Sequence, residues 1–212
     1  MKKFKFYEFA GILVPGGLFV TGILLLFPEE MAPLRSDGVT FGEFGLLLIL
    51  SYALGHLVQS IGNFVEWVWW LMLRGMPTDW VRSGKRTLIS KQQMEAVRTK
   101  LQGELNLSLP DNLTTLSKQD WYSIVRQVFT NIMGQGKTSR IDTFNANYGM
   151  NRGIAAALLG LILVALGVGA EVEWKVYAVI AILTGLALLR MHRFGVHYGR
   201  ELFVQFLSLE RK

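Results

Sequence analysis

The chain has 212 residues, of which 51% are hydrophobic and only 18% are charged. This composition leaves room for one or two modest domains and argues against a soluble globular protein. The absence of cysteine excludes disulfides, thiolate metal sites and cysteine nucleophiles. The formal net charge is +6 at pH 7, and the distribution of this charge along the chain bears on the orientation of the protein in a membrane.

Four long apolar runs divide the sequence, and each predicts a helix that crosses a membrane. The first run follows three lysines in the manner of a secretory signal, but it is too long and has no small-x-small cleavage site, so we expect an uncleaved span. The fourth run is short, and we expect its helix to continue into the arginines that follow. The runs are 9–27, 43–73, 154–170 and 176–189. The predicted fold class is all-α: a polytopic membrane protein with four transmembrane helices and a small helical cytoplasmic insert.

Charge alternates between the segments that connect these runs. Lys2, Lys3 and Lys5 precede the first span, and the segments 74–153 and 190–212 are rich in lysine and arginine. In contrast, the loops 28–42 and 171–175 are net acidic. Because lysine and arginine are retained on the cytoplasmic side of a membrane, both termini and the long middle segment are predicted to be cytoplasmic. We expect the membrane to be a bacterial inner membrane.

Helix-start signals organise the middle segment. Ser90 with Gln93, Ser117 with Asp120, and Ser139 with Asp142 each have the spacing of a residue that caps a helix. The third of these helices is predicted to run without interruption into the third span. We therefore divide the chain into four parts: 1–73, the first transmembrane pair; 74–139, a basic helical cytoplasmic subdomain; 140–190, the second transmembrane pair with a cytoplasmic extension; and 191–212, a basic cytoplasmic C-terminal helix.

The second span carries a polar stripe. His56, Gln59, Asn63 and Glu66 are spaced 3, 4 and 3 residues apart, which places them on one face of a helix. Unpaired polar groups are costly in hydrocarbon, so this face must meet another helix or water. Three interpretations stay open: hydrogen bonds between helices, the lining of a water-filled path, or a catalytic or metal site.

Small residues in the other spans favour close helix packing in an oligomer. They form small-xxx-small pairs: Gly153 with Ala157, Ala156 with Gly160, and Ala181 with Gly185. Pro15, Gly16 and Gly17 predict a kink or local unwinding in the first span. Four helices of one chain cannot enclose a wide pore, so a pore would need several copies around an axis.

A basic stripe follows the fourth span. Its residues, again spaced 3, 4 and 3 positions apart, are Arg190, Arg193, His197 and Arg200. It has two interpretations: contact with anionic lipid headgroups, or a binding site for an anionic ligand such as a nucleotide or oligonucleotide, or for a partner protein. Basic residues after the second span and before the third span are predicted to complete such a site. The candidate residues are Arg82, Lys85, Arg86, Lys137, Arg140, Arg190, Arg193, His197 and Arg200.

Enzymatic motifs are not apparent. The stretch GQGKTS (134–139) lacks the first glycine of a phosphate-binding loop, because position 131 is Asn. Only three histidines occur, which excludes a histidine-box oxygenase. We therefore predict neither catalytic residues nor a metal or other cofactor.

The layout resembles the small four-span membrane effectors encoded in bacterial anti-phage defence operons, such as the membrane subunits of Hailong-type and Kiwa-type systems. The shared features are a short N-terminal lysine run, the Pro15-Gly16-Gly17 first span, a polar second span, and a basic insert between spans two and three. The resemblance implies a homo-oligomeric channel-like effector, with a tetramer favoured, that a nucleotide, an oligonucleotide or a partner protein controls. The alternative is a non-conducting membrane anchor that recruits a soluble partner enzyme through its basic helices.

Overall fold

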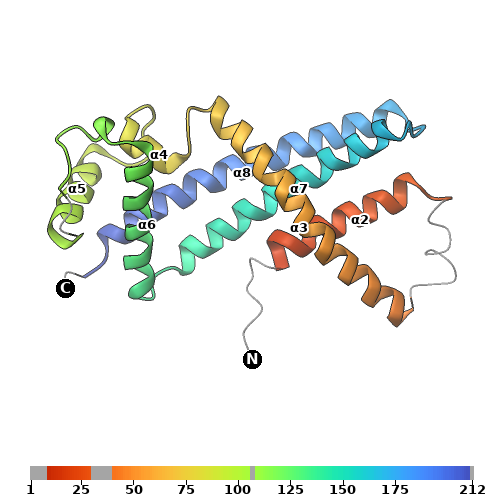
Figure 1. Cartoon of the computed structure of the whole chain (residues 1–212), viewed down its shortest axis with the longest axis horizontal. Coiled ribbons are helices and arrows are strands. Elements are labelled where there is room, and N and C mark those ends of the chain that lie inside the picture. Colours follow the sequence, from red (N-terminus) through yellow and green to blue (C-terminus); the bar gives the residue numbers. More distant parts are fainter. Residues whose placement is uncertain (1–8, 30–39, 106–107, 211–212) are drawn as a thin grey trace. The chain divides into compact units, whose positions relative to one another are not determined.

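The computed structural model describes residues 9–29, 40–105 and 108–210, and within these ranges every regular element is a helix. The predictions for Lys2, Lys3, Lys5 and most of the first loop lie outside the described residues. Figure 1 shows the elements in chain order. They are η1 (Phe9–Leu13), α2 (Val14–Leu26), α3 (Phe41–Met72), α4 (Pro77–Ser83), α5 (Lys91–Leu105), η3 (Leu113–Thr115), α6 (Lys118–Gly134), α7 (Ser139–Gly167) and α8 (Trp174–Leu207).

Four helical segments are long and apolar enough to cross a membrane: Phe9–Leu26, Phe41–Ser83, Ser139–Gly167 and Trp174–Leu207. The prediction of an all-α protein with four spans is confirmed. The third helix runs unbroken from the polar segment into the apolar run, as predicted, and α8 continues well beyond the fourth run. Helices of this composition need a hydrocarbon environment, so the protein is membrane-embedded.

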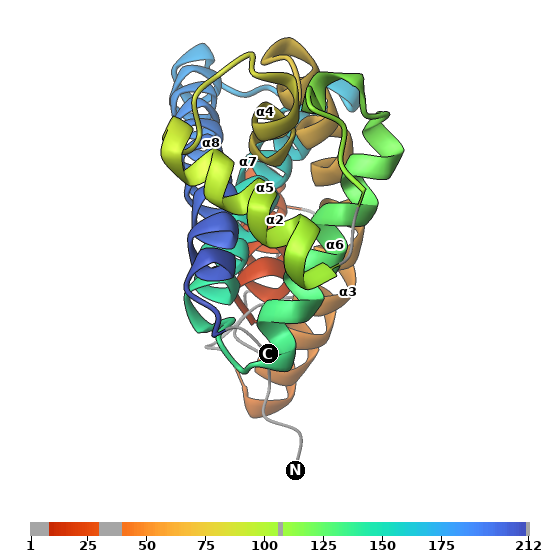
Figure 2. The same ribbon diagram turned by 90° about the vertical axis from the view of Figure 1, so that its left-hand side faces the viewer.

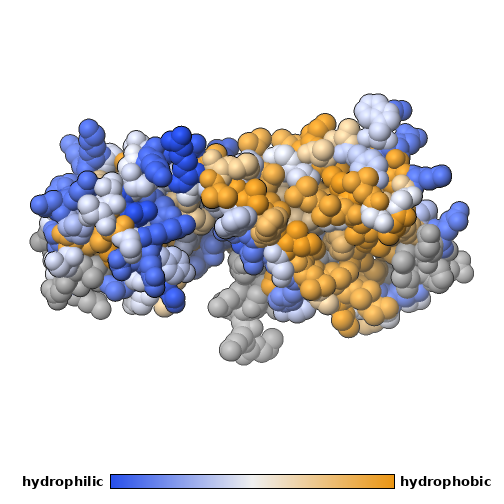
Figure 3. All heavy atoms as spheres, turned by 45° about the horizontal axis from the view of Figure 1, so that its top comes forward, coloured by the Kyte–Doolittle hydropathy of each residue, from blue (hydrophilic) through white to orange (hydrophobic). Residues whose placement is uncertain are grey.

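The chain packs into two compact units. The first, which we call the span unit, comprises Met1–Val68 and Ala146–His192; the second, the polar unit, comprises Trp69–Asn145 and Arg193–Lys212. The helices α3, α7 and α8 contribute residues to both. Figure 3 shows apolar side chains over the helices of the span unit and hydrophilic ones over those of the polar unit.

The first span begins with an irregular turn. Residues Phe9–Leu13 form a π-helical turn, and α2 follows directly with Pro15 near its start. A proline has no N–H to donate to the carbonyl four residues earlier, which here belongs to Gly11. The predicted irregularity is therefore present, and it lies on the N-terminal side of Pro15.

Glycines bring α2 against α3 in the span unit. A Cβ atom built on Gly16 would overlap the backbone of Ser51 and Gly55, and one built on Gly55 would overlap the carbonyl of Ile12. The two backbones thus touch, and any larger side chain at either glycine would force them apart. Next to this contact, Val58 of α3 packs with Ala156 and Ala157 of α7.

The small-xxx-small pairs of the sequence have two different environments. Those of the third span pack inside the chain: Ala156 and Ala157 are buried, and Gly160 faces the ring of Phe19. Ala181 is exposed, and Gly185 has open space on its Cβ side. The first two pairs therefore serve packing within one chain, while a role for Ala181 and Gly185 in an oligomer stays a prediction.

The polar unit is built from the predicted capped helices. Ser90 and Gln93 exchange hydrogen bonds of 3.0 and 3.1 Å ahead of α5, and Ser117 Oγ accepts from the Asp120 N–H at 3.0 Å ahead of α6. The third start signal was misplaced by one residue. The helix α7 begins at Ser139, so Thr138 precedes it and its carbonyl accepts from the Asp142 N–H.

Helices α4, α5 and α6 of the polar unit gather around the C-terminal part of α8. Figure 2 shows α5 lying across the end of α8 and beside α6. The core contains Trp121, whose indole N–H donates to the Thr78 carbonyl at 2.9 Å and whose ring stacks on Phe203. Leu202, Phe203 and Phe206 of α8 are fully buried there. An apolar stripe on α8 thus completes a core that α5 and α6 alone could not form.

Candidate functional site

The polar stripe of α3 is divided between two environments. Gln59 and Glu66 are half-buried and face α7, whereas His56 and Asn63 are exposed. The reason is angular: the stripe lies at the edge of the face that α3 buries, so its members alternate across that edge. The four residues therefore do not act as one surface.

The inner half of the stripe binds Arg152 of α7. The guanidinium of Arg152 forms an ion pair with the carboxylate of Glu66 through Nη1, and its Nη2 donates to Gln59 Oε1 at 2.6 Å. Gln59 Nε2 in turn donates to the carbonyls of Gly11 and Gly149. One network thus joins the three spans η1–α2, α3 and α7.

Proline chemistry explains one end of this network. The Gly11 carbonyl is the one to which Pro15, four residues later, has no N–H to donate, and it accepts a hydrogen bond from Gln59 Nε2. Glycines make the room that the network needs. A Cβ on Gly62 would lie 3.3 Å from the Arg152 side chain, and a Cβ on Gly153 would lie 2.8 Å from Gln59 Nε2.

The network is poorly hydrated within the span unit. The side chains of Arg152 and Glu66 are only 13% and 20% exposed, and Arg152 Nε is buried with no hydrogen-bond partner among the described residues. Removing charges from water is costly, and here it is offset by an opposite charge and an amide. The arrangement is chemically suited to fixing the register of the spans.

The outer half of the stripe has no such partner among the described residues of the span unit. His56 contacts the edge of Tyr52, with 4.8 Å between the ring centroids, and Tyr52 is itself 43% exposed. Asn63 is exposed on the same side of α3. At the depth of a membrane-spanning helix, lipid cannot supply hydrogen bonds to an imidazole and an amide. This surface therefore requires water or another protein surface.

Most of the candidate basic residues are engaged locally. Arg82 and Arg200 donate to the carbonyls of Leu116 and Leu88 at 2.8 and 3.2 Å, and Arg86 lies over the ring of Trp80. These contacts hold chain segments of the polar unit together. Any anionic ligand would therefore compete with these partners for the three cationic groups.

The remaining basic candidates differ in their contacts and in their exposure to solvent. Arg140 pairs with Glu201 at 3.2 Å, and Lys137 Nζ lies 3.5 Å from the Ser208 carbonyl. His197 stacks on Phe144, with 5.4 Å between the ring centroids. Arg193 and Lys85 are exposed, as is Arg190, which belongs to the span unit. The candidates do not converge on one cavity among the described residues, and an anion site formed by them stays a prediction.

Sequence reasoning missed Arg152 as a site residue. It is the only charged residue between Asp142 and Glu171, and it lies two residues before the start of the third apolar run. A lone arginine beside a span, opposite a span that carries a glutamate, is a signal for an intramembrane ion pair. The missing information was the register of the two helices.

Fold and site together define a polytopic α-helical membrane protein whose spans are joined by an internal Arg–Glu–Gln network. Comparisons with models of protein families, with characterised proteins and with solved structures found no match to this chain. Its function is therefore argued from the geometry alone.

Proposed function

We propose that the protein is a homo-oligomeric, channel-like effector of a bacterial inner membrane, with both termini in the cytoplasm. Copies would associate so that the outer faces of their α3 helices meet one another or a shared water-filled path. Control would come from the cytoplasmic side, through an anionic ligand or a partner protein. The resemblance to membrane subunits of anti-phage systems supports a role in defence.

The exposed pair His56 and Asn63 carries this proposal. Both residues lie on the outer face of α3, within the second apolar run. Gln59 and Glu66 already have partners inside the chain, whereas the described residues supply no polar partner for the side chains of His56 and Asn63. A second copy or a column of water would supply it, and a pore built from several copies would supply both.

The rival proposal, a non-conducting anchor, has its own support. The inner half of the stripe is engaged in bonds between helices, which is the behaviour of residues that stabilise a bundle. In this alternative, His56 and Asn63 would form hydrogen bonds between copies, and the polar unit would dock a soluble enzyme.

Single cysteines separate the two proposals, because the natural chain contains none. His56→Cys and Asn63→Cys would be placed in the membrane of intact vesicles and treated with a charged thiol reagent. A water-lined path predicts rapid modification at both positions, because the reagent needs water. The matched control is Ile61→Cys, on the same helix but away from the stripe, which should stay unmodified.

Oxidative cross-linking of the same variants tests assembly independently. Disulfide-linked dimers of Asn63→Cys without reagent modification would favour a packed interface and the anchor. Modification together with ion flux from reconstituted liposomes would favour the channel. A monomer that is neither modified nor cross-linked would contradict both.

The proposed control by an anion is tested on Arg193, an exposed residue whose side chain forms no hydrogen bond or ion pair with the described residues. Arg193→Gln removes a charge from an exposed side chain, whereas Arg200→Gln also removes a hydrogen bond to Leu88. Binding of an oligonucleotide probe to the detergent-solubilised protein should weaken in Arg193→Gln and fall steeply with added salt. Equal binding by Arg193→Gln and the natural protein would leave headgroup contact as the role of this residue.

A further inference from the structure

The loop that joins α3 to α4 contains a backbone conformation that arginine rarely adopts. The α3 helix ends at Met72, and the Arg74 N–H donates to the Leu71 carbonyl at 3.3 Å. The Gly75 N–H donates to the Trp70 carbonyl at 2.8 Å. This pair of bonds is a Schellman motif, in which the residue at the position of Arg74 takes a left-handed conformation. Arg74 accordingly has a φ of 67°.

Glycine is the usual residue at such a position, because it has no Cβ atom to clash with the backbone. The chain follows this rule at three other helix ends, where Gly84, Gly136 and Gly169 have φ values of 63°, 70° and 68°. Arg74 is the only residue other than glycine with a positive φ in the part of the chain that the structure describes. A side chain kept in a strained conformation indicates a role that glycine could not fill.

The helix itself does not need a charge at this position. A cation near a helix C-terminus is stabilised by the helix dipole. However, Met72 is exposed in the last turn of α3, and a lysine or arginine there would serve without backbone strain. A contact specific to the position of Arg74 would offset the strain.

Arg74 has no anionic partner of its own among the described residues. Its side chain is exposed and forms no hydrogen bond or ion pair with them. The only carboxylate in the segment 74–90 is that of Asp79. It is only 13% exposed and lies 3.9 Å from the ammonium of Lys118. The guanidinium of Arg74 is therefore open to an external anion.

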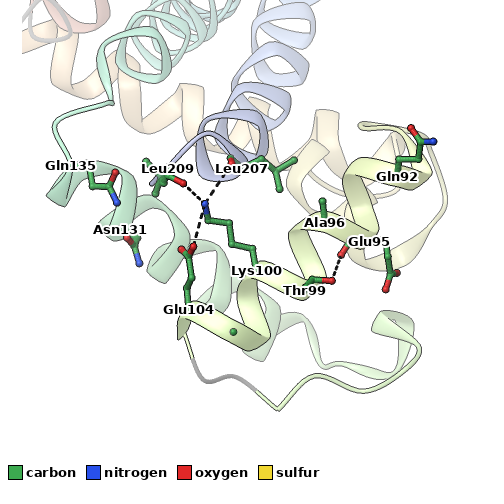
Figure 4. A pocket seen from close by; sticks show the side chains of 11 residues that line it. Gln92, Glu95, Ala96, Thr99, Lys100, Glu104, Asn131, Gln135, Leu207 and Leu209 are labelled. Atoms are coloured by element: carbon green, nitrogen blue, oxygen red, sulfur yellow. Dashed lines mark hydrogen bonds and ion pairs between the residues drawn. The ribbon is translucent and has the colours of Figure 1, made fainter. Parts of the chain in front are cut away.

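The open groove along α5, with a volume of about 990 Å³, shows the opposite situation. Lys100, which lines it, lies 3.4 Å from the carboxylate of Glu104 and donates to the carbonyls of Leu207 and Leu209 (Figure 4). The charges of this groove are thus balanced inside the chain, whereas that of Arg74 is not.

Trp80 joins the loop to a second cation. Its indole N–H donates to the Gly75 carbonyl at 3.0 Å, and the guanidinium of Arg86 lies 5.2 Å from the centroid of its ring. Arg74 and Arg86 therefore flank one buried indole, and Lys85, which is exposed, adds a positive charge beside Arg86. We call Arg74, Lys85 and Arg86 the cationic cluster.

Exposed apolar side chains directly precede this cluster. Leu71 and Met72 are 63% and 65% exposed, at the end of an apolar run that closes at residue 73. Apolar side chains that give way to cations within two or three residues are typical of the level at which a membrane helix meets the phosphate headgroups. A soluble anion would leave Leu71 and Met72 in water, whereas the acyl chains of a lipid would cover them.

We propose that the cationic cluster binds the headgroup of an anionic phospholipid, with its phosphate at Arg74 and Arg86 and an acyl chain along Leu71 and Met72. A guanidinium suits a phosphate, because it can donate two parallel hydrogen bonds to it. Three cations beside one carboxylate that is already paired favour a lipid with a net negative charge over a zwitterionic one. This binding does not depend on whether the assembly conducts.

The test measures thermal unfolding of the full chain in detergent micelles that contain the same mole fraction of either phosphatidylglycerol or phosphatidylcholine. Phosphatidylglycerol should raise the unfolding temperature of the natural protein by about 3 °C or more above its value in phosphatidylcholine, because a bound ligand stabilises the folded state. In Arg74→Gln this gain should fall by about half or more, because a charged hydrogen-bond donor is lost.

Arg74→Gly separates lipid binding from a purely structural role. Glycine takes up a positive φ without strain, so in phosphatidylcholine this variant should unfold at the same temperature as the natural protein or at a higher one. It should nevertheless lose the gain from phosphatidylglycerol, as Arg74→Gln does. The matched control is Arg126→Gln, which removes a charge from an exposed side chain of α6 and should keep the full gain.

Equal gains from phosphatidylglycerol in the natural protein, Arg74→Gln and Arg74→Gly would overturn the proposal. So would a loss in Arg126→Gln as large as that in Arg74→Gln, because the lipid would then respond to overall charge and not to one site. Glycerol 3-phosphate at the same concentration should give no comparable gain. An equal gain from it would also overturn the proposal, because the cluster would then bind a soluble anion.

Discussion

The guanidinium of Arg152 is ion-paired with the carboxylate of Glu66, a residue 86 positions earlier in the chain. Both side chains are largely shielded from solvent, and the pair links α3 to α7. Gln59 extends the link to the first span by donating to the Gly11 carbonyl. A polar stripe that looks from the sequence like one surface thus has an internal, structural half.

The first prediction concerns the ion pair itself. Arg152→Gln and Glu66→Gln should each destabilise the protein by about 1–3 kcal/mol, because each leaves a shielded charge without its partner. The double variant should lose less than the sum of the two, since no unpaired charge remains. Thermal or denaturant unfolding in detergent measures all three. Strictly additive losses would show that the two charges are not coupled.

The second prediction compares the two halves of the stripe with the same type of change. Gln59→Leu should destabilise the protein by about 1–2 kcal/mol, because the Gly11 carbonyl and the Arg152 guanidinium each lose a partner. Asn63→Leu should leave the unfolding of the isolated chain nearly unchanged, because Asn63 is exposed on the outer face. A larger loss of stability for Asn63→Leu than for Gln59→Leu would contradict the division described here.

Much of the architecture was predictable, because its signals are local. The four spans follow from the length of the apolar runs, and the starts of α5 and α6 follow from Ser90 and Ser117 with their partners three residues later. These features depend on residues within one helix. The start of α7 was predicted one residue late, because Ser139 with Asp142 resembled a cap while Thr138 held that position.

The contacts of the site were not predictable, because they depend on helix register. That Gln59 and Glu66, rather than His56 and Asn63, meet Arg152 follows from the close approach of α3 to its neighbours at Gly55 and Gly62. A shift of one residue along α3 would turn a different part of the stripe inward.

The third prediction tests the orientation. Reporter fusions after Asp37 and Glu173 should be active on the periplasmic side, and fusions after Lys100 and Lys212 on the cytoplasmic side, because the basic segments are retained inside. The measurement is alkaline phosphatase activity beside a reporter that is active only in the cytoplasm. A cytoplasmic signal from the Asp37 fusion would invert the assignment, and with it the side from which any ligand reaches the polar unit.

The fourth prediction uses two glycines of the span unit. Gly55→Leu should destabilise the protein by about 1–3 kcal/mol or prevent its folding, because the new side chain would overlap the carbonyl of Ile12. Gly185→Leu is the matched change at a position with open space, and this variant should unfold as the natural protein does.

A second measurement on Gly185→Leu tests the assembly of copies. If Ala181 and Gly185 form a close contact between copies, the bulky side chain should dissociate the oligomer in mass photometry while the monomer stays folded. An unchanged oligomer would exclude this face of α8 from the interface and leave the outer face of α3, with His56 and Asn63, as the surface through which copies meet.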